Sequence, residues 1–236
     1  SGNTVVQVNN SGNVFADECV LYHARPTTSY NNIRGLAPDA NGQVWIGYSS
    51  GNGAVQSIDT STFALSPLEK HDLRLPDGRP SIRSGVIFTD FDRDGFIDVF
   101  ITHGSGSDGP EQDHLFRGDG QGGFIDVTDD LGLITRPWMS LADLNNARAH
   151  TNSWGGNACD LNNDGWPDLL SASYGRAPNH LWQSSINLQG RTFINRSIDS
   201  GYAFDEQTDW TDNESARCHC MLNPGDDDCA GVPDPF

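Results

Sequence analysis

Two short stretches of the chain carry carboxylate and amide side chains at the spacing of a cation-binding loop. The first runs from Asp90 to Asp98 and the second from Asp160 to Asp168, and both read D-x-[DN]-x-D-G-x-x-D. Oxygen atoms at loop positions 1, 3, 5 and 9, with a backbone carbonyl at position 7, suit a hard cation that takes six to eight oxygen ligands. Glycine at position 6 allows the positive φ that a tightly curled loop needs. The spacing therefore predicts two calcium sites.

The expected ligands occupy the same five positions of each loop. They are Asp90, Asp92, Asp94, the carbonyl of Phe96 and Asp98 in the first, and Asp160, Asn162, Asp164, the carbonyl of Trp166 and Asp168 in the second. An EF-hand shares the opening of this pattern but needs a bidentate glutamate at position 12 and a helix on each side. Position 12 is isoleucine or serine here, and β-branched and aromatic residues flank the first loop. A strand–loop–strand site is therefore the better interpretation, with an ion-free Asp/Gly turn as the alternative.

Short strands surround both loops and form a repeat. They are expected over 85–89, 98–102, 114–117 and 124–128 in the first copy, and over 169–173, 180–183 and 192–195 in the second. The first acids of the two loops lie 70 positions apart. A period of this length with four short strands per unit is typical of a propeller or solenoid array. Residues 33–60, three strands with an Asn41-Gly42 turn, resemble a further propeller blade.

These patterns divide the chain into six segments. They are an irregular N-terminal segment with one strand (1–32), a propeller-like blade (33–65), a Pro-rich linker (66–84), two repeats (85–135 and 136–205), and a Cys-rich acidic tail or degenerate third repeat (206–236). In the third-repeat interpretation, Asp226, Asp228 and Asp234 take loop positions 1, 3 and 9. Alanine at position 5 removes one ligand, so a tail tied by a disulfide is the equal alternative.

Composition and charge favour an extracellular protein without a nucleic-acid partner. The formal charge is −18 and Lys70 is the single lysine, so there is no basic patch to neutralise phosphates or anionic lipids. Cations in the acidic loops would relieve part of the self-repulsion. No apolar run approaches the ~20 residues of a membrane-spanning helix, and no signal peptide is visible, as expected for a processed chain. We expect a secreted, cell-surface or periplasmic location.

Three of the five cysteines, Cys218, Cys220 and Cys229, lie close together near the C-terminal end. A local disulfide formed in an oxidising compartment is the preferred interpretation. The alternative is a soft-metal site using His219, but the paired C-x-x-C spacing of zinc sites is absent. The odd cysteine count leaves one thiol without an intramolecular partner.

The loops and their neighbouring strands resemble a known family. The strands Asp113-His114-Leu115-Phe116 and Asn179-His180-Leu181-Trp182, with the ending Gly-Gly-Phe-Ile-Asp-Val-Thr, are similar to FG-GAP/VCBS repeats, over residues 85–203 and more weakly over 33–60. That family builds calcium-bearing β-propellers in integrin α subunits and many bacterial surface proteins. The resemblance implies an all-β fold of four-stranded antiparallel blades, with calcium held by the loop acids.

The chain is short for a complete propeller. Propellers typically have four to eight blades, and this length allows three or four. We expect a partial propeller or a segment of a larger one. The alternatives are a small closed ring and a ring that another subunit completes.

The sequence contains no catalytic constellation. Neither H-E-x-x-H nor G-x-S-x-G occurs, and the most conspicuous acids are assigned to calcium. His103 and His150 are expected on a polar rim, whereas His114 and His180 occupy equivalent repeat positions and are expected to be structural. We therefore expect no enzyme activity.

The expected function is that of an extracellular calcium-binding module in protein–protein interaction or in surface or matrix assembly, with other protein subunits as partners. Carbohydrate recognition is the alternative, either as a lectin or as a polysaccharide lyase on the same scaffold. Three tryptophans could stack on sugar rings if they are exposed, although burial within a blade is the commoner use of such aromatics: Trp138, Trp154 and Trp210.

Overall fold

The computed structural model describes residues 5–9, 19–24, 33–48, 54–62, 64, 84–104, 111–137, 139–174, 177–203, 217 and 220–232. These residues are mainly β-strands, which confirms the all-β prediction. Most of the expected linker, Trp138, Trp210, Cys218 and the side chain of Cys19 lie outside the described residues. No helix among the described residues is long and apolar enough to cross a membrane.

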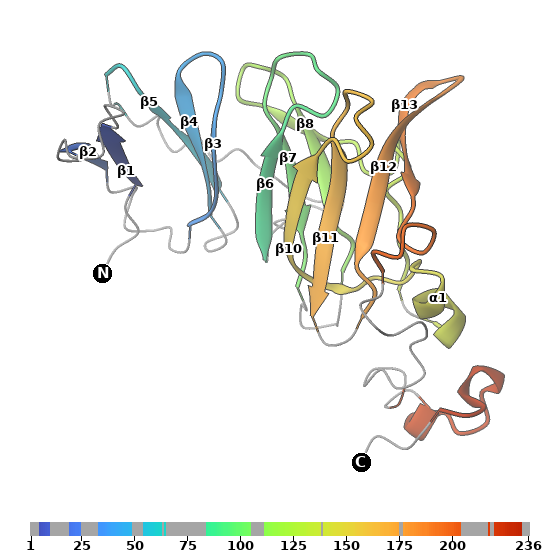
Figure 1. Cartoon of the computed structure of the whole chain (residues 1–236). Coiled ribbons are helices and arrows are strands. Elements are labelled where there is room, and N and C mark those ends of the chain that lie inside the picture. The colour runs from blue at the N-terminus through green and yellow to red at the C-terminus, as the bar shows by residue number, and fades with distance from the viewer. Residues whose placement is uncertain are drawn as a thin grey trace.

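Four antiparallel sheets follow one another along the chain, and each is a meander of consecutive strands (Figure 1). The first pairs β1 (Val5–Asn9) with β2 (Cys19–Ala24), and the second contains β3 (Ile33–Pro38), β4 (Gln43–Tyr48) and β5 (Ala54–Asp59). The third contains β6 (Gly85–Thr89), β7 (Asp98–Thr102), β8 (His114–Gly118) and β9 (Phe124–Asp126). The fourth contains β10 (Asn152–Cys159), β11 (Asp168–Tyr174), β12 (His180–Asn187) and β13 (Gly190–Asn195). Strand β2 was not expected from the sequence.

The sheet β6–β9 is covered on both of its faces. Because side chains alternate across a strand, Val99 and Ile101 of β7 face the sheet β3–β5, where they form one core cluster with Val55, Val86 and Phe116. Phe100 faces the opposite way, into a second cluster shared with the sheet β10–β13. The members of this second cluster are Phe91, Phe100, Leu115, Val127, Leu133, Leu169, Trp182 and Phe193. Three sheets therefore stack face to face, and one hydrophobic layer lies on each side of the middle sheet, β6–β9.

Strand glycines let neighbouring sheets approach closely. A Cβ added to Gly47 of β4 would lie 2.6 Å from the Val86 side chain of β6. A Cβ on Gly156 of β10 would lie 2.8 Å from Ile87 Cδ1 and 3.0 Å from Thr102 Cγ2, on β6 and β7. Real Cβ atoms do not fit at such separations, so these positions require glycine for packing rather than for backbone freedom.

The connection between the two four-stranded sheets contains helix α1 (Leu141–Asn145), which the sequence analysis did not expect. The Ser140 side chain accepts a hydrogen bond from the Asp143 N–H and so caps the helix. The buried Asp143 carboxylate forms an ion pair with Arg136. A five-residue helix is too short to display a helical hydrophobic period, and the sequence signal was correspondingly weak.

The C-terminal region contains the expected local disulfide. Cys220 and Cys229 are bonded, with a Cα–Cα distance of 5.4 Å, and the bond encloses the 3-10 helix η1 (Asp227–Cys229). Cys159, at the end of β10, is a free thiol.

Candidate metal centre

Both predicted loops lie between two antiparallel strands and share one backbone conformation. The first joins β6 to β7 and the second joins β10 to β11, at the upper edge of the molecule in Figure 1. The position-6 glycines have φ of +88° at Gly95 and +91° at Gly165. Position 4 is also left-handed, with φ of +60° at Arg93 and +57° at Asn163. The strand–loop–strand geometry is that expected from the sequence, and it is not that of an EF-hand.

The first loop brings three carboxylates together. One oxygen from each of Asp90, Asp92 and Asp98 lies within 4.8 Å of the other two, so this group could hold a metal ion. Asp90 Oδ2 accepts the Gly95 N–H at 3.1 Å, whereas Asp90 Oδ1 is buried and has no hydrogen-bond partner among the described residues. Buried carboxylate oxygens normally have a partner, and a cation in this loop would supply one. The donor set therefore fits a hard divalent cation.

Asp98, at position 9, is the most buried acid of the loop and has two roles. Its side chain is fully buried, and its two oxygens accept the N–H groups of Phe91 and Gly118, both at 2.9 Å. The Phe91 bond closes the loop, and the Gly118 bond ties it to the end of β8. Asp98 therefore fixes the loop to the sheet before any ion is bound.

The electrostatics of the first loop favour a bound cation. Burial raises the pKa of Asp98 to about 7, with smaller contributions in the same direction from the charges of Asp92 and Asp94. Burial also raises the pKa of Asp92, and the neighbouring Asp94 charge adds to this effect. A divalent ion would compensate this crowded negative charge.

The predicted ligand Asp94 lies outside the group of three carboxylates. Its Oδ1 accepts the Phe96 N–H at 2.8 Å, on the exposed side of the loop. Its equivalent in the second loop, Asp164, makes the same bond to the Trp166 N–H at 2.9 Å. The Asn162 amide and this N–H lower the pKa of Asp164.

The second loop repeats the internal hydrogen bonds of the first. Asp160 Oδ2 accepts the Gly165 N–H at 2.8 Å, as Asp90 does with Gly95. Asp168 accepts the N–H groups of Leu161 at 3.1 Å and Ser184 at 2.9 Å, which reproduces the two bonds of Asp98. The chemical difference at position 3 is that an amide, Asn162, replaces a carboxylate. The second loop therefore offers one negative charge fewer.

The third candidate loop has a different local fold. Asp226 precedes η1, and the described part of this region is helical turns closed by a disulfide rather than a strand. Gly231, at position 6, does have a positive φ of +85°. Asp234 and the side chain of Asp228 lie outside the described residues, so this site remains a prediction.

Two arginines near the loops were not recognised from the sequence. Arg93, within the first loop, and Arg191, on β13, both lie over the ring of Trp166 in the second loop. The sequence did hold a sign that Arg93 is unusual. Asparagine suits the left-handed conformation of position 4 better than arginine does, and asparagine occupies that position in the second loop.

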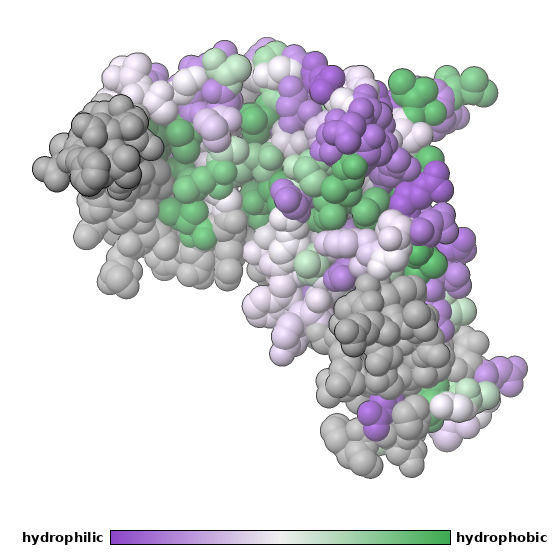
Figure 2. All heavy atoms as spheres, in the orientation of Figure 1, coloured by the Kyte–Doolittle hydropathy of each residue, from purple (hydrophilic) through white to green (hydrophobic). Residues whose placement is uncertain are grey.

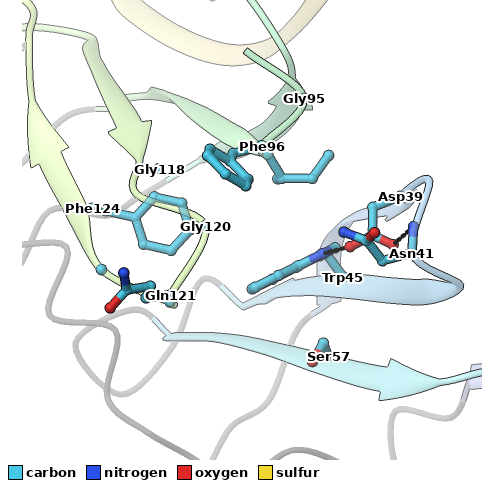
Figure 3. Close-up of a pocket in the computed structure, with 13 residues that line it drawn as sticks. Asp39, Asn41, Trp45, Ser57, Gly95, Phe96, Gly118, Gly120, Gln121 and Phe124 are labelled. Carbon is cyan, nitrogen blue, oxygen red and sulfur yellow. Dashed lines mark hydrogen bonds between the residues drawn. The ribbon is translucent and has the colours of Figure 1, made fainter.

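A cavity of about 320 Å³ lies beside the first loop (Figure 3). Phe96 of the loop, Phe124 of β9 and Trp45 of β4 contribute aromatic rings to its wall. Asp39 accepts the Asn41 and Gln43 N–H groups at 2.8 and 2.9 Å and the Trp45 Nε1–H at 2.9 Å. The Asp39–Asn41 stretch is therefore a turn that orients Trp45, as the sequence indicated, and not a third loop of the same kind.

The histidines differ in part from expectation. His103 is buried, with 1% of its surface exposed, so its predicted place on a polar rim is wrong. His103 directly follows β7, and its backbone N–H donates a hydrogen bond to Asp113 Oδ1 at 2.8 Å. His114 Nδ1 contacts Asp126 Oδ2 at 2.8 Å, and His180 is buried against Trp182. These contacts agree with the structural role expected for His114 and His180.

No protein-family model matches this chain, and no curated protein matches it either. The candidate site therefore rests on the geometry of the two loops.

Proposed function

We propose that the protein is an extracellular calcium-binding module of β-propeller blades that acts in protein–protein assembly. The carrying observation is the group of Asp90, Asp92 and Asp98, in which the buried Asp90 Oδ1 has no hydrogen-bond partner among the residues that the structure describes. Oxygen-only ligands on a curled, glycine-containing loop favour calcium, because calcium accepts more oxygen ligands and looser geometry than magnesium. The disulfide between Cys220 and Cys229 is consistent with an oxidising, extracellular environment.

The stacked sheets support a propeller arrangement, in which the two four-stranded sheets each supply one loop to the same edge. When bound, calcium would neutralise the loop acids and link their oxygens. Asp98 and Asp168 already tie each loop to the following hairpin, so an ion would complete a cross-link between adjacent strands. The ion would stabilise the folded state because the unfolded chain has no preformed site.

The outer face of β10–β13 supports a role in assembly. Phe91, Phe100 and Leu115 are at most 2% exposed and belong to the core cluster shared with β10–β13. Their repeat equivalents on the outer face are Leu161, which is 49% exposed, Leu170, which is half-buried, and Leu181, which is 9% exposed. A depression of about 360 Å³ lies there, lined by Leu161 and Leu181 together with polar and charged side chains. A mixed apolar and polar surface, at the position that packs against a sheet in the preceding repeat, suits a protein partner.

The test of calcium binding is isothermal titration calorimetry with thermal unfolding in calcium and in EGTA. We expect two bound ions and a melting temperature that rises with calcium concentration. Asp90→Asn/Asp92→Asn and Asp160→Asn/Asp164→Asn variants should each lose one ion. Asp129→Asn/Asp130→Asn, which removes two exposed acids outside the loops, is the matched charge control. A melting curve that chelation leaves unchanged would refute the proposal.

A second candidate function, glycan binding, is favoured by one aromatic pair. Trp154 and Tyr174 are 59% and 68% exposed, and their ring centroids lie 5.7 Å apart. The strand bulge between Ser153 and Gly155 directs Trp154 outward. Adjacent exposed rings can stack on sugar faces. Binding to a glycan array that is lost in Trp154→Ala would establish this function, and an array without binding would exclude it for the glycans printed.

A further inference from the structure

The ring of Trp166 connects the two loops. Arg191 Cζ lies 3.4 Å from its centroid and Arg93 Cζ lies 5.1 Å from it. Arg93 also lies against the neighbouring glycine, because a Cβ added to Gly165 would be 3.3 Å from Arg93 Nη1. The guanidinium group of the first loop thus contacts positions 6 and 7 of the second. Position 7 is the residue whose carbonyl is the expected ligand.

Arg93 is held in place by the curl of its own loop. Its φ of +60° is a left-handed conformation that few residues other than glycine adopt, with asparagine and aspartate the usual exceptions. The equivalent residue in the second loop is Asn163, which follows that preference. The direction of the Arg93 side chain therefore depends on the first loop keeping its curled backbone.

Arg191 links the opposite side of the contact to another expected ligand. Its Nη1 donates to Ser184 Oγ at 3.1 Å, and the Ser184 N–H donates to Asp168 Oδ1 at 2.9 Å. Trp166 is thus attached to position 9 of its own loop through Arg191 and Ser184. When Arg93 restrains the Trp166 ring, it therefore restrains a residue that is already linked to Asp168 in the second loop.

We infer that Arg93 is a positioning residue for the second loop, and that a cation in the first loop raises the calcium affinity of the second. This inference rests on the proposed calcium binding. A cation fixes the curl of the first loop, and the curl fixes Arg93 on Trp166. The second loop then loses less conformational freedom when its own ion binds, which is positive coupling.

Direct charge repulsion predicts the opposite sign. A divalent ion in the first loop would repel a second one nearby and weaken its binding. Because Asp90→Asn/Asp92→Asn removes two carboxylate charges together with the divalent ion, long-range electrostatics alone should leave the Kd of the second loop nearly unchanged in that variant, whether or not Arg93 is present. The sign of the coupling and its dependence on Arg93 together separate the two mechanisms.

The test is a cycle of variants measured by calorimetry with calcium. Asp90→Asn/Asp92→Asn disables the first loop, and its effect on the second loop is measured with Arg93 intact and with Arg93→Ala. With Arg93 intact we expect the Kd of the second loop to rise about two- to fivefold, as for loss of one exposed cation–π contact. With Arg93→Ala, disabling the first loop should change this Kd little. Arg148→Ala, an exposed arginine near α1, is the matched control.

A second measurement leaves the first loop intact, so it does not require that the Asp90→Asn/Asp92→Asn protein folds. In Asp160→Asn/Asp164→Asn protein, calcium can fill only the first loop, and the Trp166 indole N–H resonance should shift on titration. The shift should be absent when Arg93→Ala is added.

The coupling is overturned if disabling the first loop leaves the Kd of the second loop unchanged or lowers it. It is also overturned if the Trp166 resonance does not shift when calcium fills the first loop. If the wild-type chain binds two ions independently, the coupling alone fails. If it binds none, the proposed function fails as well.

Discussion

At the scale of single residues, the two position-9 acids are the most constrained members of the loops. Asp98 and Asp168 are buried, and each accepts hydrogen bonds from two backbone N–H groups. A hydrogen bond to a charged group contributes roughly 1.5–3 kcal/mol, and leaving a buried donor without an acceptor costs a comparable amount. These two residues therefore serve the fold as well as the ion.

This dual role gives a prediction that is independent of calcium. Asp98→Asn places an NH₂ group, which cannot accept a hydrogen bond, against one of two N–H donors. At pH 5.5, below the Asp98 pKa of about 7, the wild-type side chain carries no buried charge, so we expect the free energy of unfolding in EGTA to fall by roughly 2 kcal/mol. Asp94→Asn is the comparison, because the amide retains an oxygen for the Phe96 N–H on the exposed side of the loop. Its unfolding free energy in EGTA should change by less than about 0.5 kcal/mol. Equal effects in urea denaturation would contradict the assignment.

At the scale of elements, the faces of the strands decide how the sheets stack. The β7 side chains alternate between the two core clusters, so a shift by one residue would exchange both sets. Asp98 begins this strand and Thr102 ends it, and the whole strand is buried. The loop is therefore anchored on the most protected strand of the sheet, which makes its geometry reproducible.

The adjacent glycines of β10 provide a matched test of close sheet packing. A Cβ on Gly156 would lie 2.7 Å from the Leu170 carbonyl oxygen and 2.8 Å from Ile87 Cδ1, whereas a Cβ on Gly155 meets no atom within 4 Å. Gly156→Ala should therefore lower the free energy of unfolding by about 1–3 kcal/mol, as overpacking does. Gly155→Ala should leave it within about 0.5 kcal/mol of the wild type. Chemical denaturation of both variants decides the matter, and a tolerated Gly156→Ala would show that the sheets can separate locally.

At the scale of the whole molecule, stability depends on pH through buried imidazoles. Burial lowers the pKa of His180 from 6.5 to about 4, and it lowers the pKa of His150 to about 4 as well. The unfolded chain therefore binds more protons than the folded chain between these values. Stability from these groups is present above pH 6.5 and is lost as the pH falls toward 4.

The acid side of the stability curve tests this burial. In EGTA, wild-type stability should fall more steeply between pH 6.5 and 4 than that of His180→Gln, because the glutamine takes up no proton. Asp98 and Asp113, whose pKa values burial raises to about 7 and about 6, contribute slopes of opposite sign, and these are common to both proteins. Between pH 7 and 8 the two slopes should coincide. Parallel curves throughout would show that His180 protonates without cost in the folded state.

Much of this molecule follows from local sequence. The loop pattern of acids and glycine determined where the backbone curls, because only glycine adopts the positive φ of position 6 at low cost. β-branched and aromatic residues beside the first loop predicted β6 and β7, and the repeat predicted β11, each to within a residue at either end. The repeat of 70 positions between Asp90 and Asp160 indicated that both loops share one construction.

Other features were decided only by the tertiary structure. His103 is buried through contacts with residues distant in the chain, among them Asp113 and His114. Asp94 resembles the other loop acids in sequence, yet it bonds to the Phe96 N–H outside the group of three carboxylates. The contact of Arg93 with Trp166 exists because two sheets stack with their loops at the same edge. Sequence spacing defines what one loop can bind, whereas the packing of neighbouring sheets defines which side chains reach from one loop to the next.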